Sequence, residues 1–269
     1  MKYLTYFTLA VISLYFGCQS DTPTDPGANQ TGGYSKIHTV ESNGTKFEVW
    51  SSSSSNFIYG YNNIGFKVFI NNNEKTTGFV KFKATMYHGI NGPSHTVPSK
   101  DNFYYDSQTQ LFKGYIVFIM YDTAAFWAAD YNYNNEAQID SSVFPLYMND
   151  LSQIKVWDNI ITERIYILSL VSPLSPRVGL NDIVLMLHES NGLVTYRELD
   201  SAEMFIKPWM ESMGHGSGNN VNPVNLGGGM YKGTANFTMA GEWFLYDSIK
   251  YNGQFITKTP PPKFIFDVY

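Results

Sequence analysis

Cysteine is nearly absent from this sequence. Cys18 is the only cysteine among 269 residues, so no disulfide framework can form, and any metal site must use methionine, histidine, carboxylate or backbone ligands. Charge is also scarce, since charged residues make up 15% of the chain and the formal net charge is −5. A nucleic-acid-binding protein needs a basic surface. We therefore expect no nucleic-acid partner.

Catalytic signatures and membrane-spanning runs are missing as well. The chain contains no Gly-X-Ser-X-Gly elbow, no phosphate-binding loop and no His-Glu-X-X-His motif, and we expect no enzymatic activity. The apolar run at residues 3–16 is too short to cross a bilayer comfortably. Its length is instead typical of the core of a signal peptide.

The N-terminal segment predicts export and lipid anchoring. Lys2 gives a positive start, and Gly17 and Cys18 end the apolar run. This pair resembles the lipobox of bacterial lipoproteins, in which the cysteine is acylated. We expect a signal peptide at residues 1–17, attachment to the lipid bilayer through Cys18, and a flexible polar linker at residues 18–34. The predicted location is the cell envelope, with the outer membrane or cell surface favoured; a plain secretory signal is the alternative.

Aromatic residues and glycine are abundant, which favours strands and turns over helices. The chain has 20 Tyr, 19 Phe and 22 Gly. Segments that alternate or nearly alternate apolar and polar residues, as half-buried strands do, include residues 46–50, 79–84 and 263–268. Asn-Gly pairs, which supply the two positive φ angles of a tight hairpin turn, occur at residues 43–44, 91–92, 191–192 and 252–253. The predicted class is all-β.

An internal repeat is the strongest feature of the sequence. Residues 111–120 align without gaps on residues 230–239, an offset of 119 (230 − 111). Both segments continue to an aromatic pair and then to an aspartate three residues beyond it, Asp130 in one copy and Asp247 in the other. A set of matches at nearly one spacing indicates duplication.

The same offset relates the Gly-X-Asn sequence at residues 60–62 to that at residues 179–181. The repeat predicts a first domain at residues 35–145 and a second at residues 160–269. Each contains about seven predicted strands, the size of an immunoglobulin-like β-sandwich. We therefore expect two such domains in tandem, after the signal peptide and flexible linker.

Methionine and histidine occur together in both predicted domains. The candidate metal ligands are Met86, His88 and His95 in the first domain and Met210, Met213 and His215 in the second. Each domain contains a Met-X-His sequence, and in an extended segment residues two apart point to the same side. Thioether sulfur suits Cu(I), and imidazole suits both copper oxidation states. The predicted cofactor is copper, with Cu(I) favoured.

The alternative for these methionines is a structural role, because methionine also fills gaps in apolar cores. Four methionines lie within apolar strand patterns and are assigned to the core: Met120, Met186, Met204 and Met239.

Residues 209–216, 229–233 and 237–243 together resemble the YtkA-like/FixH-like domain family. The shared features are a Met-rich stretch ending in Met-Gly-His, a Gly-aromatic-X-Gly strand and a Phe-X-Met-X-Gly-X-Trp strand. The resemblance implies a small extracytoplasmic β-sandwich associated with copper handling or cytochrome oxidase assembly. It implies Met210, Met213 and His215 as ligands, with Trp209 either shielding the metal or packing beside it. The first domain shows this resemblance only through the internal repeat. We therefore expect tandem copies of the family's domain, of which the second is the clearer.

Two functions compete. The first is a membrane-anchored extracytoplasmic copper-binding protein that captures, buffers or delivers copper through Met/His ligands, with a copper donor or acceptor protein as partner. The second is a surface lipoprotein module that binds an envelope protein or a glycan without metal. The copper-binding function requires the side chains of Met210, Met213 and His215 to converge at a partly open edge of the domain.

Overall fold

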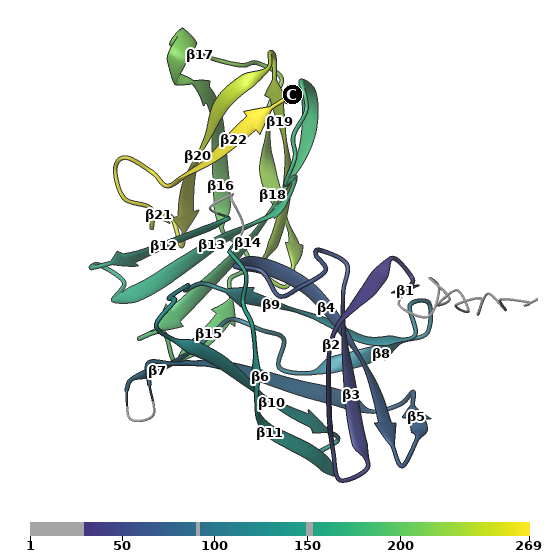
Figure 1. The fold of residues 1–269 in the computed structure, drawn as a ribbon. Helices are drawn as coiled ribbons and strands as arrows, with labels where there is room; N and C mark the ends of the chain where they lie inside the picture. Colours follow the sequence, from purple (N-terminus) through teal and green to yellow (C-terminus); the bar gives the residue numbers. More distant parts are fainter. Residues whose placement is uncertain (1–29, 90–91, 149–152) are drawn as a thin grey trace, which may run out of the picture.

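The computed structural model describes residues 30–89, 92–148 and 153–269, and this part of the chain is built of β-strands with one short 3-10 turn, η2 (Glu211–Met213). The prediction of an all-β fold is confirmed (Figure 1). The predicted signal peptide at residues 1–17 and the predicted lipid attachment at Cys18 lie outside the described residues. No helix in the described part is long and apolar enough to cross a membrane.

The first half forms one large antiparallel sheet that folds over on itself (Figure 1). Its strands are β1 (Gln30–Thr31), β2 (Tyr34–Ser42), β3 (Thr45–Ser51), β4 (Gly60–Ile70), β5 (Asn73–Lys75), β6 (Phe79–Tyr87), β7 (Ser94–Thr96), β8 (Phe103–Asp106), β9 (Leu111–Phe118), β10 (Phe126–Tyr133) and β11 (Ala137–Phe144). They follow the order β1-β2-β3-β4-β9-β8-β6-β10-β11, with β5 on β4 and β7 on β6. Phe66 of β4 packs on Phe82 of β6, with 5.3 Å between ring centroids. Strands far apart in the order therefore face each other as the two layers of a sandwich.

The second half is a sandwich of two separate sheets. Its strands are β12 (Ile154–Asn159), β13 (Arg164–Ser172), β14 (Gly179–Asn191), β15 (Thr195–Glu198), β16 (Glu203–Met210), β17 (His215–Gly216), β18 (Val221–Gly227), β19 (Met230–Phe237), β20 (Gly241–Tyr251), β21 (Gln254–Phe255) and β22 (Lys263–Val268). One sheet has the order β12-β13-β14-β19-β18 with β15 on β14, and the other has the order β17-β16-β20-β21 with β22 on β20.

Alternating residues build the core of the second half. Phe264, Phe266 and Val268 on β22 are buried, and the residues between them are exposed. β16 shows the same period of two, with every second side chain facing inward. Fully burying one such phenylalanine contributes about 2 kcal/mol. The strand pattern visible in the sequence therefore sets which face of each strand meets the core.

The two halves share local structure at the offset of 119 residues. In the first, Gly60 of β4 pairs with Phe118 of β9; in the second, Gly179 of β14 pairs with Phe237 of β19. Both glycines have positive φ angles, 108° and 107°. Residues with side chains rarely adopt this conformation, so the same strained strand start occurs twice at corresponding positions.

An asparagine two residues after each glycine holds this strand start. The buried Asn62 amide donates to the carbonyl oxygens of Ile58 (2.7 Å) and Gly60 (2.9 Å), and its oxygen accepts from the Ile58 amide (3.0 Å). Asn181 makes the same three hydrogen bonds to the residues four and two positions before it. The repeat seen in the sequence thus corresponds to a repeated structural element.

Replacing Asn62 by alanine should lower the free energy of unfolding by about 2 kcal/mol, because a buried backbone N–H and two carbonyls lose their partners. The same change at the half-buried Asn181 should cost about half as much, since water can replace the amide there. Chemical denaturation of the two variants provides the comparison. Equal losses would show that burial does not decide the contribution of this element.

The halves are joined by a shared apolar cluster and by hydrogen bonds. Ile154, Ile167 and Met186 of the second half belong to the same buried cluster as the core of the first. Tyr196 of the second half donates its hydroxyl to the carbonyl of Thr96 (2.7 Å), and the Thr96 hydroxyl donates to a carbonyl of the second half. The two sandwiches therefore pack directly against each other.

Candidate functional site

Met210 and His215 face each other across a tight hairpin at one end of the second sandwich. Met210 ends β16, His215 begins β17, and the two residues are directly paired in the antiparallel register. The chain reverses through η2 and Gly214, which has a φ of 65° and donates its N–H to the carbonyl of Met210 (2.9 Å). Directly paired residues project from the same face, with Cβ atoms about 5 Å apart. The hairpin therefore brings a thioether and an imidazole together.

A buried tryptophan borders this pair. The ring centroids of Trp243 and His215 are 5.9 Å apart. The pairing of β16 with β20 ends at Trp209 and Phe244, and the next position in the same register places Trp243 opposite Met210. The Trp243 indole donates to the carbonyl oxygen of Met239 (2.9 Å). Met210 is buried and His215 is half-buried, so the pair lies at the edge of the core.

The hydrogen bond of His215 defines which ring nitrogen can bind a metal. Its Nδ1 lies 2.9 Å from the carbonyl oxygen of Gly216. A carbonyl only accepts, so Nδ1 carries the proton and Nε2 keeps its lone pair in the neutral ring. Metal-binding histidines usually donate their second nitrogen to a carbonyl or carboxylate in this way.

The expected extended conformation of Met213 is wrong, because residues 211–213 form η2, and Met213 is 60% exposed. For Trp209 the sequence left two roles open, shielding the metal or packing beside it. In β16 the buried side chains alternate with outward-facing ones, and Met210 takes the inward position. Trp209 instead lies under the ammonium of Lys207, 4.5 Å from its ring centroid. The aromatic neighbour of the site is Trp243.

The assignment of four methionines to the core holds for three of them. Met186 and Met204 are buried, and Met120 packs against the core of the first half. Met239 is 37% exposed, because it follows the end of β19 in the turn that leads to Gly241. Its carbonyl oxygen accepts the hydrogen bond from the indole of Trp243, the residue that borders the Met210–His215 pair.

The first half contains a corresponding arrangement. Met86 of β6 pairs with His95 of β7 and with Trp127 of β10. The Trp127 ring packs edge-on against Phe118 at 4.9 Å, as Trp243 packs on Phe237 at 5.5 Å in the second half. Met86 therefore corresponds to Met210, and His95 to His215.

This correspondence corrects the equivalence drawn from the two Met-X-His sequences. His88 follows the end of β6, so it is no structural counterpart of His215. It still lies near the pair: its ring centroid is 5.7 Å from that of His95, and its Nδ1 is 3.3 Å from a carboxylate oxygen of Asp122. Within the described ranges, no group of three or more His, Cys, Asp or Glu side chains is placed to hold a metal ion.

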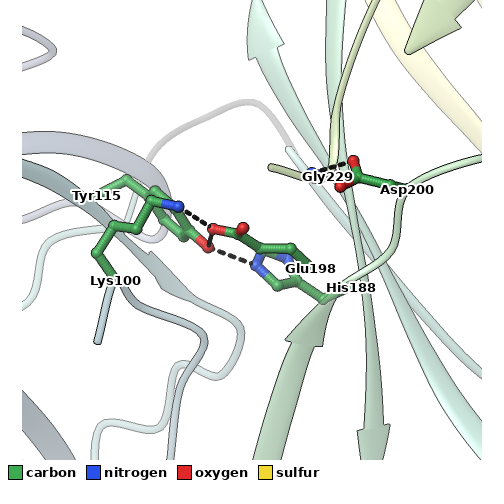
Figure 2. Close-up of polar contacts among 6 residues, drawn as sticks. All are labelled: Lys100, Tyr115, His188, Glu198, Asp200 and Gly229. Atoms are coloured by element: carbon green, nitrogen blue, oxygen red, sulfur yellow. Dashed lines mark hydrogen bonds and ion pairs between the residues drawn. The ribbon is translucent and has the colours of Figure 1, made fainter. Parts of the chain in front are cut away.

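A second polar cluster lies where the two halves meet, and nothing in the sequence pointed to it (Figure 2). The Tyr115 hydroxyl of β9 donates to Glu198 of β15 (2.7 Å), and Nε2 of His188 on β14 lies 3.0 Å from the same hydroxyl. Since the single phenolic proton is used on Glu198, His188 donates from Nε2. Lys100 forms an ion pair with the same Glu198 oxygen.

Burial controls the protonation of this cluster. It lowers the pKa of His188 to about 4, so the imidazole is neutral at physiological pH. Burial also acts to raise the pKa of Glu198, but hydrogen bonds from Lys100 and Tyr115 outweigh it and hold that pKa below its usual value. Burial and then the Glu198 carboxylate raise the pKa of Tyr115. The cluster is therefore a carboxylate held by a phenol and an ammonium.

One family model matches a segment of the second half. Residues 164–246 match the model of the YtkA-like family; this segment runs from the start of β13 into β20 and contains Met210, His215 and Trp243. The YtkA-like domain predicted from the sequence is confirmed for this segment. No curated protein matches the chain.

Three similar solved structures come from an adhesin, an S-layer protein and a set of fibronectin(III)-like modules. The Escherichia coli adhesin FdeC is 14% identical, with a TM-score of 0.26, and the match covers 86% of this chain and 66% of that chain. Domains 5-6 of the S-layer protein SbsC are 9% identical, with a TM-score of 0.30 and coverage of 87% and 97%. Fibronectin(III)-like modules of Clostridium thermocellum CbhA are 14% identical, with a TM-score of 0.22 and coverage of 79% and 87%.

Proposed function

We propose that this protein is a membrane-anchored, extracytoplasmic copper-binding protein that captures, buffers or delivers copper through methionine and histidine. The observation that carries the proposal is the direct pairing of Met210 with His215 beside Trp243. A thioether is a soft, uncharged ligand that suits Cu(I), and imidazole completes a set that hard ions do not prefer. Metal binding of this kind requires no activated nucleophile, so the role that we propose is not enzymatic.

The ligand set that we propose for the second half is Met210, His215 and Met239. Met239 replaces Met213 because it lies in the turn beside Trp243, whereas Met213 sits on the solvent side of η2. The Trp243 ring would then lie near a bound copper ion, and a cation beside an aromatic ring is stabilised by its quadrupole.

The first half is, in this proposal, a second copy of the YtkA-like domain with its own copper site. The support is the shared register of Met86 with His95 and Trp127. His88 adds a second imidazole close to His95. A site with two imidazoles suits Cu(II) as well as Cu(I), so the two halves would differ in their preference for oxidation state.

The setting of the proposed function follows from the N-terminal sequence. Lipid attachment at Cys18 would hold both copper sites at the membrane surface within reach of a copper donor or acceptor protein. The polar segment that follows Cys18 would act as a flexible tether. Retention of the protein with membranes, and its release when Cys18 is replaced by serine, would support this setting.

The test is a Cu(I) titration against a competing chelator under reducing conditions. His215→Ala should weaken binding at the second site roughly 100-fold. Met210→Leu, which keeps the packed volume, should weaken it similarly, while Met204→Leu on the same face of β16 is the matched control and should have no effect. Met213→Ala should also leave the affinity unchanged.

Equal affinity in all of these variants would remove the copper hypothesis at this site and leave the surface interaction module as the explanation. A loss of affinity in Met213→Ala alone would show that the ligand is the exposed sulfur and that the pairing with Met210 is structural.

A further inference from the structure

A polar cavity of about 510 Å³ opens between the two halves, and its lining contains none of the proposed copper ligands. The first half contributes residues 99–102, Tyr104 and Tyr115, and the second half contributes residues 196–198 of β15 with His188 and Asp200. The Tyr115–Glu198 and Tyr115–His188 contacts form its inner wall (Figure 2). The volume lies within the range of small-molecule sites.

The two cationic side chains of this cavity, Lys100 and Arg197, are each paired with a glutamate. Lys100 pairs with Glu198. Arg197 donates two hydrogen bonds to Glu189, at 2.6 and 3.0 Å. Asp200 accepts from the backbone N–H of Gly229 at 2.8 Å (Figure 2). Asp101 and Asp200 add two carboxylates to the lining with no cationic partner of their own among the described residues, so the lining disfavours an anionic ligand and offers acceptors to hydroxyl groups.

The groups that stay available are hydrogen-bonding groups beside an exposed ring. The hydrogen bonds from Lys100 and Tyr115 both end on Oε1 of Glu198, which leaves Oε2 for a ligand, and Lys100 uses one of its three donors there. Tyr104 is 62% exposed at the cavity. A carboxylate and an ammonium beside an aromatic face match a sugar, whose hydroxyls both donate and accept and whose ring presents C–H groups.

The inner wall is preorganised. Tyr115 is fixed by hydrogen bonds from its own hydroxyl and from His188, both across the junction between the halves. Its ring also lies 5.5 Å from the Lys100 ammonium. A site whose side chains are already held loses little conformational entropy on binding.

We infer that this cavity between the two sandwiches binds a neutral saccharide, with Tyr104 as the stacking platform and Glu198 and Lys100 as hydrogen-bonding partners of its hydroxyls. Recognition by both halves at once makes the site a property of the tandem arrangement, independent of copper.

The test uses the full chain and an array of neutral mono- to tetrasaccharides, followed by calorimetry with the strongest binder. Tyr104→Ala, at an exposed position that leaves the core intact, should weaken binding about 10-fold. Tyr147→Ala is the matched control, since Tyr147 is also exposed, at 48%, but lies outside the cavity, and it should bind as the wild type does. Copper loading should not change the affinity.

Failure of every neutral saccharide on the array to bind would overturn the inference. So would binding that Tyr104→Ala leaves unchanged, or selective retention of anionic glycans with affinity that falls steeply as salt is added. None of these results bears on the copper proposal, whose ligands lie elsewhere.

Discussion

Replacing Asp247 by asparagine is expected to raise the free energy of unfolding at pH 7 by about 3 kcal/mol. Asp247 lies on β20 and is fully buried, and within the described residues neither of its carboxylate oxygens has a hydrogen-bond partner. Burial raises its pKa well above the usual value, and the positive charge of Lys155 opposes the rise only in part. The wild-type fold must therefore bury a carboxylate or take up a proton.

The sign of the pH dependence follows from this raised pKa. The unfolded chain ionises Asp247 near pH 4, while the folded protein holds it neutral, so the wild type loses stability as the pH rises above 4 toward the folded pKa. The asparagine variant does not titrate there. Its advantage should be large at pH 7 and should vanish near pH 3.

Chemical denaturation at several pH values measures this difference. Asp130→Asn is the control, because Asp130 is half-buried and accepts a hydrogen bond from the backbone N–H of Ser141 at 2.9 Å; it should be neutral or slightly destabilising. A loss of stability at pH 7 in Asp247→Asn would show that Lys155 holds the carboxylate ionised and that the pair stabilises the fold.

Acidification is expected to destabilise the junction between the halves through His188. Burial lowers the pKa of His188 from 6.5 to about 4, so between these values the unfolded state binds a proton that the folded state does not. Above pH 6.5, His188 should make no pH-dependent contribution to the free energy of unfolding. Below pH 6.5 that free energy should fall, by about 3 kcal/mol in total at pH 4.

His188→Gln removes this titration and keeps a donor for the Tyr115 hydroxyl. The stability of the wild type relative to this variant should therefore decline by the stated amount across the window. His38 is half-buried and burial lowers its pKa as well, so the same comparison with His38→Gln should show a smaller decline. A constant difference between wild type and His188→Gln over the whole window would contradict the account of a neutral buried imidazole.

Much of the fold was accessible from the sequence because its signals are local. Alternation predicted strands such as β22, and the Asn-Gly pair at residues 43–44 has positive φ at both positions, 49° and 73°. The pair at residues 191–192 differs, since the positive angles fall on Gly192 and Leu193. The one-residue shift arises because the neighbouring register, and not the dipeptide alone, sets the turn.

The candidate site was less accessible because register is a long-range property. The sequence matched Met86 with Met213, whereas the hairpin geometry matches Met86 with Met210, since residues 211–213 leave the extended conformation. The match of Asp130 with Asp247 is also displaced by one residue. Trp127 pairs with Met86, and Trp243 lies opposite Met210, so the two tryptophans correspond. Counted from these tryptophans, Asp247 corresponds to the residue after Asp130.

The cluster at the junction carried no usable signal. His188 follows five apolar residues in β14, and its partner Tyr115 is 73 positions away. Only the packing of one sandwich on the other brings the two together. Contacts of this kind depend on the arrangement of whole domains, which local patterns do not encode.

X-ray absorption at the copper edge of the Cu(I)-loaded protein tests the central claim most directly. The account predicts sulfur scatterers together with the multiple-scattering signature of imidazole, and loss of the imidazole signature in the His88→Ala/His95→Ala/His215→Ala triple variant. A shell made only of nitrogen and oxygen, or a spectrum that the triple variant leaves unchanged, would contradict it.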